Sequence, residues 1–220
     1  MGIPSLNSVK GVPFMKKLIF VAILAAMCAA PVAAAPTTLT LKASPTIVAY
    51  GGATTLSGVL STQKTGQNVA IQGQERGTGA FKTVATVKTT TGGAFTYAAK
   101  PTMNTKYQAK QKAVVSAITA VQVAPVATLK KLARNKFTVS VTGATTFVGK
   151  FVVFQRLRRT KWVSLKHVTL ATVTPTTKPT EVSSATFTIK LPTRLRVRVV
   201  LPAAQAGTCY LPTKSKVIRS

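Results

Sequence analysis

From residue 38 onward the chain is a series of short stretches rich in Val, Thr, Phe and Tyr, each bounded by Gly, Pro, Asn or Ser. This pattern is typical of strands joined by turns. Apolar and polar residues alternate within the stretches, as at Leu39/Leu41 and Val69/Ile71. Such alternation is expected of strands that bury one face. Helix signals are nearly absent after residue 36, so the pattern predicts an all-β protein.

Strands are predicted at 38–43, 54–60, 67–72, 81–89, 94–100, 105–110 and 116–123. A second series begins after Pro125, with strands predicted at 127–132, 136–142, 150–156, 161–173, 185–191, 195–201 and 214–219. The turn at Thr91-Gly92-Gly93 is of the positive-φ type. One sheet of so many strands would be unusual. We therefore expect two domains, 36–124 and 125–220.

An internal repeat supports this division. The stretch Gly66–Gln72 (GQNVAIQ) aligns with Gly149–Gln155 (GKFVVFQ), and each is followed by a basic, polar hairpin tip. Further matching places are Phe81 with Trp162, 93–97 with 184–189 and, less well, Tyr107 with Arg198. The repeat predicts two copies of one β domain. We expect Phe81 and Trp162 to pack between sheets; the alternative for Trp162 is a platform for stacking a sugar ring.

Several short strings carry a family resemblance: Tyr50-Gly51-Gly52, Leu56-Ser57-Gly58, Gly66-Gln67-Asn68-Val69 and Gly93-Ala94-Phe95-Thr96-Tyr97. They resemble bacterial immunoglobulin-like repeats of exported and surface proteins, particularly of actinobacteria. The resemblance covers 37–123 well and 126–219 loosely. It implies tandem antiparallel sandwiches without a disulfide and a role as spacer or adhesive module. It names no substrate, because sandwich folds carry many unrelated functions.

The pattern of residues at the N-terminus predicts an export signal. Lys16 and Lys17 precede an apolar run over 18–30, and small residues follow at 32–34. This is the layout of a secretory signal peptide, predicted over 1–34 with Met15 as the better start. The run is too short to span a hydrocarbon core of ~30 Å, so no transmembrane anchor is expected. We expect a secreted, extracellular protein, retained non-covalently at the cell envelope or released.

Cleavage after residue 34 removes Cys28 and leaves Cys209 as the single cysteine. Cys209 is then either a small buried hydrophobe or an accessible thiol that joins two chains. Its place near Gly207 and Tyr210, in a predicted loop, favours a thiol that is partly accessible to solvent. The sequence therefore predicts that oxidation can yield a disulfide-linked dimer.

The sequence contains too few acidic and histidine residues for catalysis to be expected. The chain has thirty Lys and Arg and only two acidic residues, Glu75 and Glu181, both in predicted loops, so the formal net charge is +28. A general acid/base pair needs two carboxylates or a carboxylate with a histidine. The single histidine, His167, reads as a plain surface residue, and a Ser-His-Asp set lacks its aspartate. Ligands for zinc or calcium are too few. We expect no enzyme activity, cofactor or metal.

The basic residues are unevenly distributed. Residues 126–220 contain eighteen Lys and Arg and one acidic residue, Glu181, a net charge of +17. Residues 36–125 contain nine Lys and Arg and one acidic residue, Glu75, a net charge of +8. The tentative anion-binding residues are Arg194, Arg196 and Arg198, which alternate with apolar residues, and Arg156, Arg158, Arg159 and Lys161 around a hairpin tip. Alternation places the first three on one face, and we expect them to share it with Arg156 and Arg158. Guanidinium groups suit planar contact with phosphate or carboxylate; the alternative is a solvated surface.

The sequence thus predicts a non-catalytic secreted or envelope-associated protein that binds anionic envelope polymers through a basic surface. One alternative is a structural spacer or adhesin module with a protein partner. Another is a polyanion-neutralising antimicrobial protein. Nucleic acid is a weaker candidate, because no helix is available for a major groove and no paired RNA-binding aromatics are evident.

Overall fold

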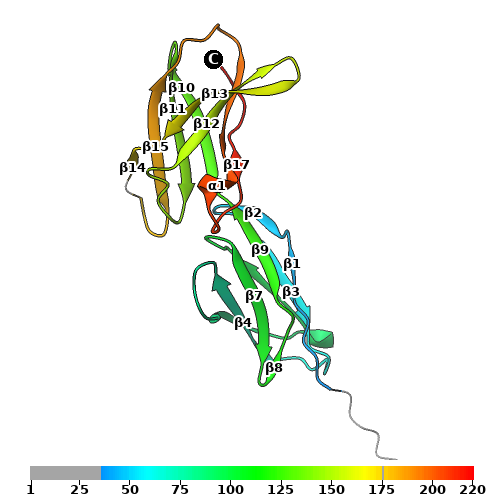
Figure 1. The fold of residues 1–220 in the computed structure, drawn as a ribbon. Helices are drawn as coiled ribbons and strands as arrows, with labels where there is room; N and C mark the ends of the chain where they lie inside the picture. The colour runs from blue at the N-terminus through cyan, green and yellow to red at the C-terminus, as the bar shows by residue number, and fades with distance from the viewer. Residues whose placement is uncertain (1–35, 175) are drawn as a thin grey trace, which may run out of the picture. The chain divides into compact units, whose positions relative to one another are not determined.

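A computed structural model describes residues 36–174 and 176–220 (Figure 1). The predicted signal peptide, 1–34, lies outside the described residues. The described part is built of strands β1 to β18, one 3-10 turn and one four-residue helix, α1 (Ala203–Ala206). The prediction of an all-β protein is confirmed. Below, residues 36–124 are called the first half and residues 125–220 the second half.

The first half contains β1 (Lys42–Ser44), β2 (Ile47–Ala49), β3 (Thr54–Val59), β4 (Asn68–Glu75), β5 (Lys82–Lys88), β6 (Ala94–Ala99), β7 (Thr105–Gln111), β8 (Val114–Val115) and β9 (Thr119–Ala124). The second half contains β10 (Val126–Ala133), β11 (Lys136–Gly143), β12 (Phe151–Arg158), β13 (Lys161–Thr169), β14 (Thr172–Thr174), β15 (Glu181–Thr188), β16 (Arg196–Leu201), β17 (Thr213–Lys214) and β18 (Ile218–Arg219).

Each half is made of two sheets. Strand order in the first half is β1-β3-β6 and β2-β9-β7-β4-β5, with β8 beside β7. Strand order in the second half is β10-β11-β15-β14 and β13-β12-β16-β17, with β18 beside β16. Every pairing is antiparallel except β2 with β9. Among the described residues, no strand before Pro125 pairs with a strand after it. Pro36–Ser220 nevertheless form one compact unit by contacts.

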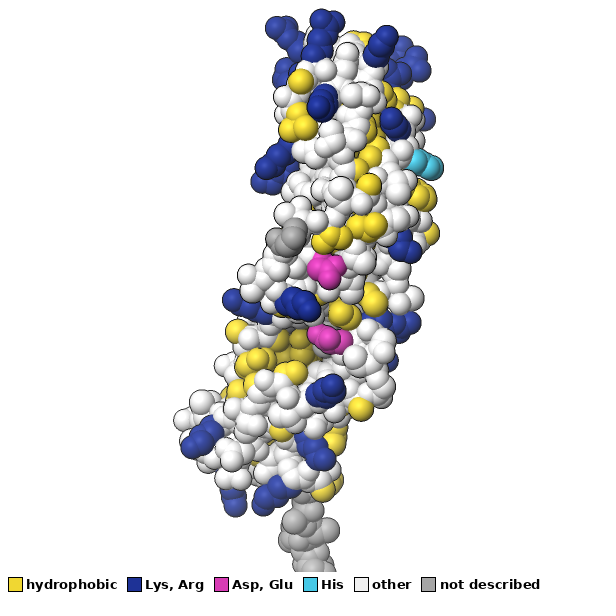
Figure 2. Space-filling model, turned by 90° about the vertical axis from the view of Figure 1, so that its left-hand side faces the viewer, with side chains coloured by type: hydrophobic (Ala, Val, Ile, Leu, Met, Phe, Trp, Pro, Cys, Tyr) yellow, Lys and Arg dark blue, Asp and Glu magenta, His cyan; other side chains and the backbone are white. Residues whose placement is uncertain are grey.

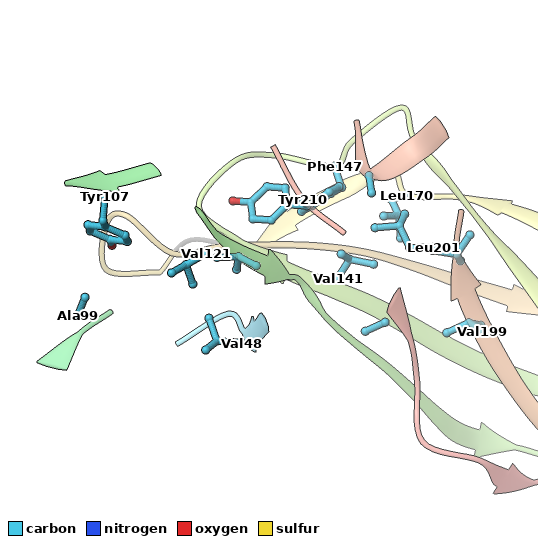
Figure 3. Close-up of a cluster of buried hydrophobic side chains, with 14 of the residues drawn as sticks. Val48, Ala99, Tyr107, Val121, Val141, Phe147, Leu170, Val199, Leu201 and Tyr210 are labelled. Carbon is cyan, nitrogen blue, oxygen red and sulfur yellow. The ribbon is translucent and has the colours of Figure 1, made fainter. Parts of the chain in front are cut away.

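The second half is held by aromatic packing between its two sheets. Phe137 of β11 stacks on Phe187 of β15, and Phe154 of β12 approaches both rings, with centroids 5.4 and 5.1 Å away. Tilted and edge-on arrangements at these distances are favourable beyond the burial of area. Figure 3 shows further core side chains, among them Tyr210 beside Phe147, whose centroids lie 5.5 Å apart.

The first half is packed mainly with aliphatic side chains around Phe95. Leu56, Val69 and Ile71 are completely buried. Gly58 is needed where β3 meets the Phe95 ring, since a Cβ at this position would fall 2.4 Å from the ring. The cores of the two halves are therefore filled with different kinds of side chain.

The internal repeat is visible in the backbone of two hairpins, β4–β5 and β12–β13. Each hairpin has a register shift at the same aligned place, between Ile71 and Gln72 in one and between Phe154 and Gln155 in the other. The glycine before each hairpin has nearly the same positive φ, +77° and +79°. The alignment of Gly66–Gln72 with Gly149–Gln155 therefore describes equivalent structure.

A buried serine extends the equivalence to β7 and β16. Ser116 Oγ accepts from Ala109 N–H (2.9 Å) and donates to Ala117 O (2.9 Å). Ser215 Oγ accepts from Val199 N–H (3.0 Å) and donates to Lys216 O (2.9 Å). Matching Ala109 with Val199 makes Val197 the equivalent of Tyr107. The sequence alignment of Tyr107 with Arg198 is wrong by one residue, because it compares a buried position with one on the opposite face.

Some predicted elements differ from the structure. The stretch 161–173 forms two strands, and 214–219 forms two short strands interrupted where the Ser215 hydroxyl replaces a backbone partner. The strand β2 is too short to show alternation, and α1 was not predicted. Both glutamates lie in strands, Glu75 at the end of β4 and Glu181 at the start of β15. Their prediction as loop residues is wrong.

Candidate anion-binding face

Strand register shows which way the arginines of β12 and β16 point. Gln155 lies opposite Arg198, and Arg156 lies opposite Val197. Residues paired across a sheet point the same way, and successive residues of a strand point opposite ways. Val197 is completely buried, so Arg156 points toward the core side of the sheet. Arg198 and Gln155 point toward its outer side.

The outer face of this sheet is defined here by Phe151, Gln155, Trp162, Ser164, His167, Arg196, Arg198, Lys214 and Arg219. It combines exposed or half-buried aromatic rings with basic and amide groups. The acidic residues of the described part lie in other sheets, Glu75 in β4 and Glu181 in β15. Figure 2 shows one side of the molecule, on which Lys and Arg side chains occur along the whole length and are most crowded at one end.

Arg198 is fixed at the centre of the outer face by two contacts. Its guanidinium carbon lies 3.9 Å from the centre of the Trp162 ring. Its Nε donates a hydrogen bond to Gln155 Oε1 at 3.0 Å. A cation over an indole is attracted by the negative ring face. Partial burial lowers the pKa of Arg198 from its ordinary value. The result is a side chain with a defined orientation, in contrast to a freely moving surface arginine.

The prediction that Trp162 and Phe81 pack between the sheets is wrong. Neither belongs to the buried core or to the residues packed against it. In β13 the register shift leaves Leu165 as an extra residue, and in β5 the corresponding extra residue is Val84. One extra residue reverses the faces of all residues beyond it. Trp162 and Phe81 therefore lie on outer faces.

Like charges oppose each other directly at two places in this sheet. Arg196 pairs with Arg219 on the outer face. Arg158 pairs with Lys161 at the tip of the β12–β13 hairpin. Like charges directly opposite are destabilising by a few tenths of a kcal/mol up to ~1 kcal/mol. A bound anion between Arg196 and Arg219 would remove that cost.

The predicted anion-binding residues do not form one surface. Arg196 and Arg198 share the outer face, whereas Arg194 lies in the loop before β16, where its backbone N–H donates to Ser220 O at 3.3 Å. Arg159 is exposed in the hairpin turn with a φ of +53°. Arg156 points the other way, and its Nε is buried without a hydrogen-bond partner. The expectation that Arg156 and Arg158 share the face of Arg198 is wrong, because they occupy the alternate positions of β12.

Sequence reasoning missed several members of the outer face. Phe151 and His167 stack with ring centres 4.6 Å apart and nearly parallel planes (9°). His167 is exposed, and Phe151 is half-buried. Arg219 and Lys214 join the face from β18 and β17. Phe151 alternates with Gln155, and His167 alternates with buried Val168, so both could have been placed there from the sequence. Trp162 needed knowledge of the bulge, because it lies on the other side of Leu165.

The first half offers the same face with different side chains. Gln72 and Gln108 are the equivalents of Gln155 and Arg198, and Gln108 Nε2 donates to Gln72 Oε1 at 2.9 Å. The place of Arg196 is taken by Lys106, that of Arg219 by Ala120 and that of Trp162 by Phe81. Glu75 stands at the place of Arg158. The backbone arrangement therefore does not require the arginines of the second half.

Cys209 lies between α1 and β17 and is a free, half-buried thiol. Its Sγ lies 4.0 Å from Arg76 O, and its carbonyl accepts a hydrogen bond from Asn104 N–H at 2.9 Å. The thiol is thus neither a core residue nor fully exposed. The disulfide-linked dimer stays a prediction.

Within residues 36–174 and 176–220, no three His, Cys, Asp or Glu side chains come together in a way that could hold a metal ion. In the same part of the chain, no helix has the length and apolar character needed to cross a membrane. Neither a protein-family model nor a curated protein sequence matches this chain.

Proposed function

We propose that the chain is a non-catalytic, exported protein of two immunoglobulin-like sandwich domains that binds anionic polymers of the cell envelope. The observation that carries the proposal is the outer face of the second half. There Arg196 directly opposes Arg219, beside an Arg198 that is held in place by Trp162 and Gln155. This arrangement costs stability in the free protein and is suited to a bound anion.

The duplicated architecture supports the same proposal. The first half has a neutral amide pair where the second half has Arg198. Because both versions fit the same backbone, the arginines are explained by function better than by folding. The +17 balance of residues 126–220 adds a long-range attraction for polyanions. Envelope polymers are the polyanions that an exported protein meets first.

A spacer or adhesin role is the second candidate. It is favoured by hydrogen bonds that join β9 and Asn104 to the segment 208–211. Leu211 N–H donates to Val123 O at 2.8 Å, and Asn104 Nδ2 donates to Thr208 O at 3.0 Å. Such bonds suit a tandem module that holds two binding surfaces at a fixed separation. This role requires a protein partner.

Fractionation of the producing cells tests the proposal. The protein should be found outside the cytoplasm, with a mature N-terminus following Ala34. Charge-held protein should be released by 1 M salt, because exposed charges are then screened within ~3 Å. Release by salt, together with salt-sensitive binding to isolated envelope polymers, supports the proposal. Retention in the cytoplasm, or envelope association that 1 M salt leaves unchanged, overturns it.

A further inference from the structure

We propose that the outer face of the second half is a binding surface for an acidic polysaccharide, with Trp162 stacking a sugar ring and Arg196, Arg198 and Arg219 holding carboxylates. This inference rests on the proposed function and names the class of polymer. It starts from the position of the two aromatic groups on the outer face.

The aromatic groups stand at two ends of an elongated surface. Phe151 and His167 stack at one end, and Trp162 lies opposite Leu157 at the other. Phe151 and Leu157 are six residues apart on β12, which corresponds to roughly 20 Å at ~3.3 Å per residue. Gln155 and Ser164 lie between them, with Gln155 Nε2 3.4 Å from Ser164 Oγ. Aromatic surface at both ends and hydroxyl and amide groups in the middle suit an extended chain with both apolar and polar faces.

The Trp162 end is prepared for a ring that carries a negative group. Arg198 covers one face of the indole at 3.9 Å, so the sugar ring of this proposal would stack on the opposite face. The Nε of Arg198 is already used by Gln155. The remaining donors of the guanidinium are Nη1 and Nη2, which together can bind a carboxylate in bidentate fashion. A uronic acid combines the two required features, since its ring presents C–H groups for stacking and its substituent is a carboxylate. Arg196 and Arg219 lie beside this position on the same face.

The spacing of charges and rings favours a polysaccharide over single-stranded nucleic acid. A nucleic acid strand has a phosphate on every nucleotide and is bound by aromatic residues that stack successive bases along a basic track. Here the arginines gather at the Trp162 end, and the second aromatic pair stands roughly 20 Å away, with one lysine, Lys214, in its row of the sheet. A polymer of larger units with fewer charges matches this spacing better.

The first half provides matched controls for two residues of the proposed surface. Phe81 is the equivalent of Trp162, and Lys106 is the equivalent of Arg196. Gln108 stands at the place of Arg198 and donates to Gln72. Substituting these residues removes a similar side chain from the same backbone position without touching the proposed surface.

The experiment measures binding of the mature chain to polygalacturonate, polyphosphate and an oligothymidylate of equal charge, at low and moderate salt. Trp162 is the single tryptophan, so its fluorescence reports occupancy of the surface directly. We expect polygalacturonate to quench or shift this fluorescence. Trp162→Ala should weaken polygalacturonate binding about tenfold, the equivalent of ~1.4 kcal/mol of stacking. It should leave polyphosphate binding unchanged.

Trp162→Phe should keep most of the affinity, and Phe81→Ala should change neither ligand's binding. Arg198→Gln, which recreates the amide pair of the first half, should weaken polygalacturonate and polyphosphate alike. Thermal unfolding of each variant identifies any loss of binding that results from misfolding, and Trp162→Phe keeps the test valid if Trp162→Ala does not fold.

The outcomes separate the inference from the proposed function. Tryptophan-independent binding of all three polymers leaves the proposed function in place and overturns the polysaccharide inference. Tighter, Trp162-dependent binding of the oligothymidylate also overturns it and indicates a nucleic-acid surface. If none of the polymers binds at low salt, both proposals fall.

Discussion

The outer faces of the two halves have equivalent backbones but carry different side chains. In the first half, β4 and β7 present Gln72 and Gln108, and Phe81 comes directly before β5. In the second half, β12, β13 and β16 present Gln155, Arg198 and Trp162 at the same places. Even the hydrogen bond to the central glutamine is kept, at 2.9 and 3.0 Å.

This difference separates what the fold requires from what was added to it. Both halves keep the bulge, the positive-φ glycine and the buried serine, so these features are requirements of the backbone. The arginines and the tryptophan occur in one half only. They are therefore the candidates for function, and the following predictions test the two groups separately.

The largest effect is expected from removing equivalent core side chains. Phe154→Ala and Ile71→Ala delete completely buried side chains at the same position of the two halves. Each should lower the free energy of unfolding by ~2–5 kcal/mol, through lost burial and the cavity that remains. Chemical denaturation measures the loss, with the more exposed Val163→Ala as a control of small effect. Equal stability of Phe154→Ala and the parent chain would show that the second core is assigned wrongly.

The buried serines should have a smaller, matched effect. Ser116→Ala and Ser215→Ala each leave the backbone N–H of Ala109 or Val199 without its acceptor. An unsatisfied buried donor costs ~1–3 kcal/mol. Denaturation should give similar losses in the two variants, whereas the exposed Ser164→Ala should be nearly neutral. A loss in one variant alone would mean that the two serines are not equivalent.

Tyr107 should make stability fall at alkaline pH, as should Tyr210 of the second half, whose pKa is also raised by burial. Burial raises the pKa of Tyr107 to about 12, and Val197 is its equivalent in the second half. The unfolded chain releases the phenolic proton at lower pH than the folded chain. The contribution of Tyr107 to stability is therefore complete below pH ~10 and is lost as pH rises, by about 1 kcal/mol near pH 11. Denaturation from pH 9 to pH 11 should show a smaller decline for Tyr107→Phe; an unchanged decline would contradict this assignment.

The smallest effect is expected from the opposed arginines. Arg196→Gln should raise the stability of the free protein by a few tenths of a kcal/mol at low salt, because it removes repulsion from Arg219. Lys106→Gln is the matched control, since Lys106 lies opposite the neutral Ala120, and it should give no gain. The gain should vanish at high salt. A loss of stability on Arg196→Gln would show that another group already neutralises the pair.

Much of the fold could be predicted from local patterns. Alternation located β4 and β12 to within a few residues, and the matching strings from Gly66 and Gly149 located equivalent hairpins. The outer face could be predicted only in part. Arg196 and Arg198 were placed together by alternation, because no bulge interrupts β16. The prediction that Trp162 packs in the core rested on the buried tryptophan of such sandwiches, and the bulge in β13 makes it wrong.

The sequence by itself determined the all-β architecture, the internal repeat and the concentration of positive charge after residue 126. These properties depend on the order and kind of neighbouring residues, which the sequence states directly. Only the tertiary structure decided that Trp162 faces outward, that Arg156 faces the other way, and that Arg219 opposes Arg196. A single extra residue in β13, Leu165, reverses the faces of the residues on one side of it relative to those on the other. Strand pairing also joins residues far apart in the chain. Neither effect changes the local pattern of hydrophobic and polar positions.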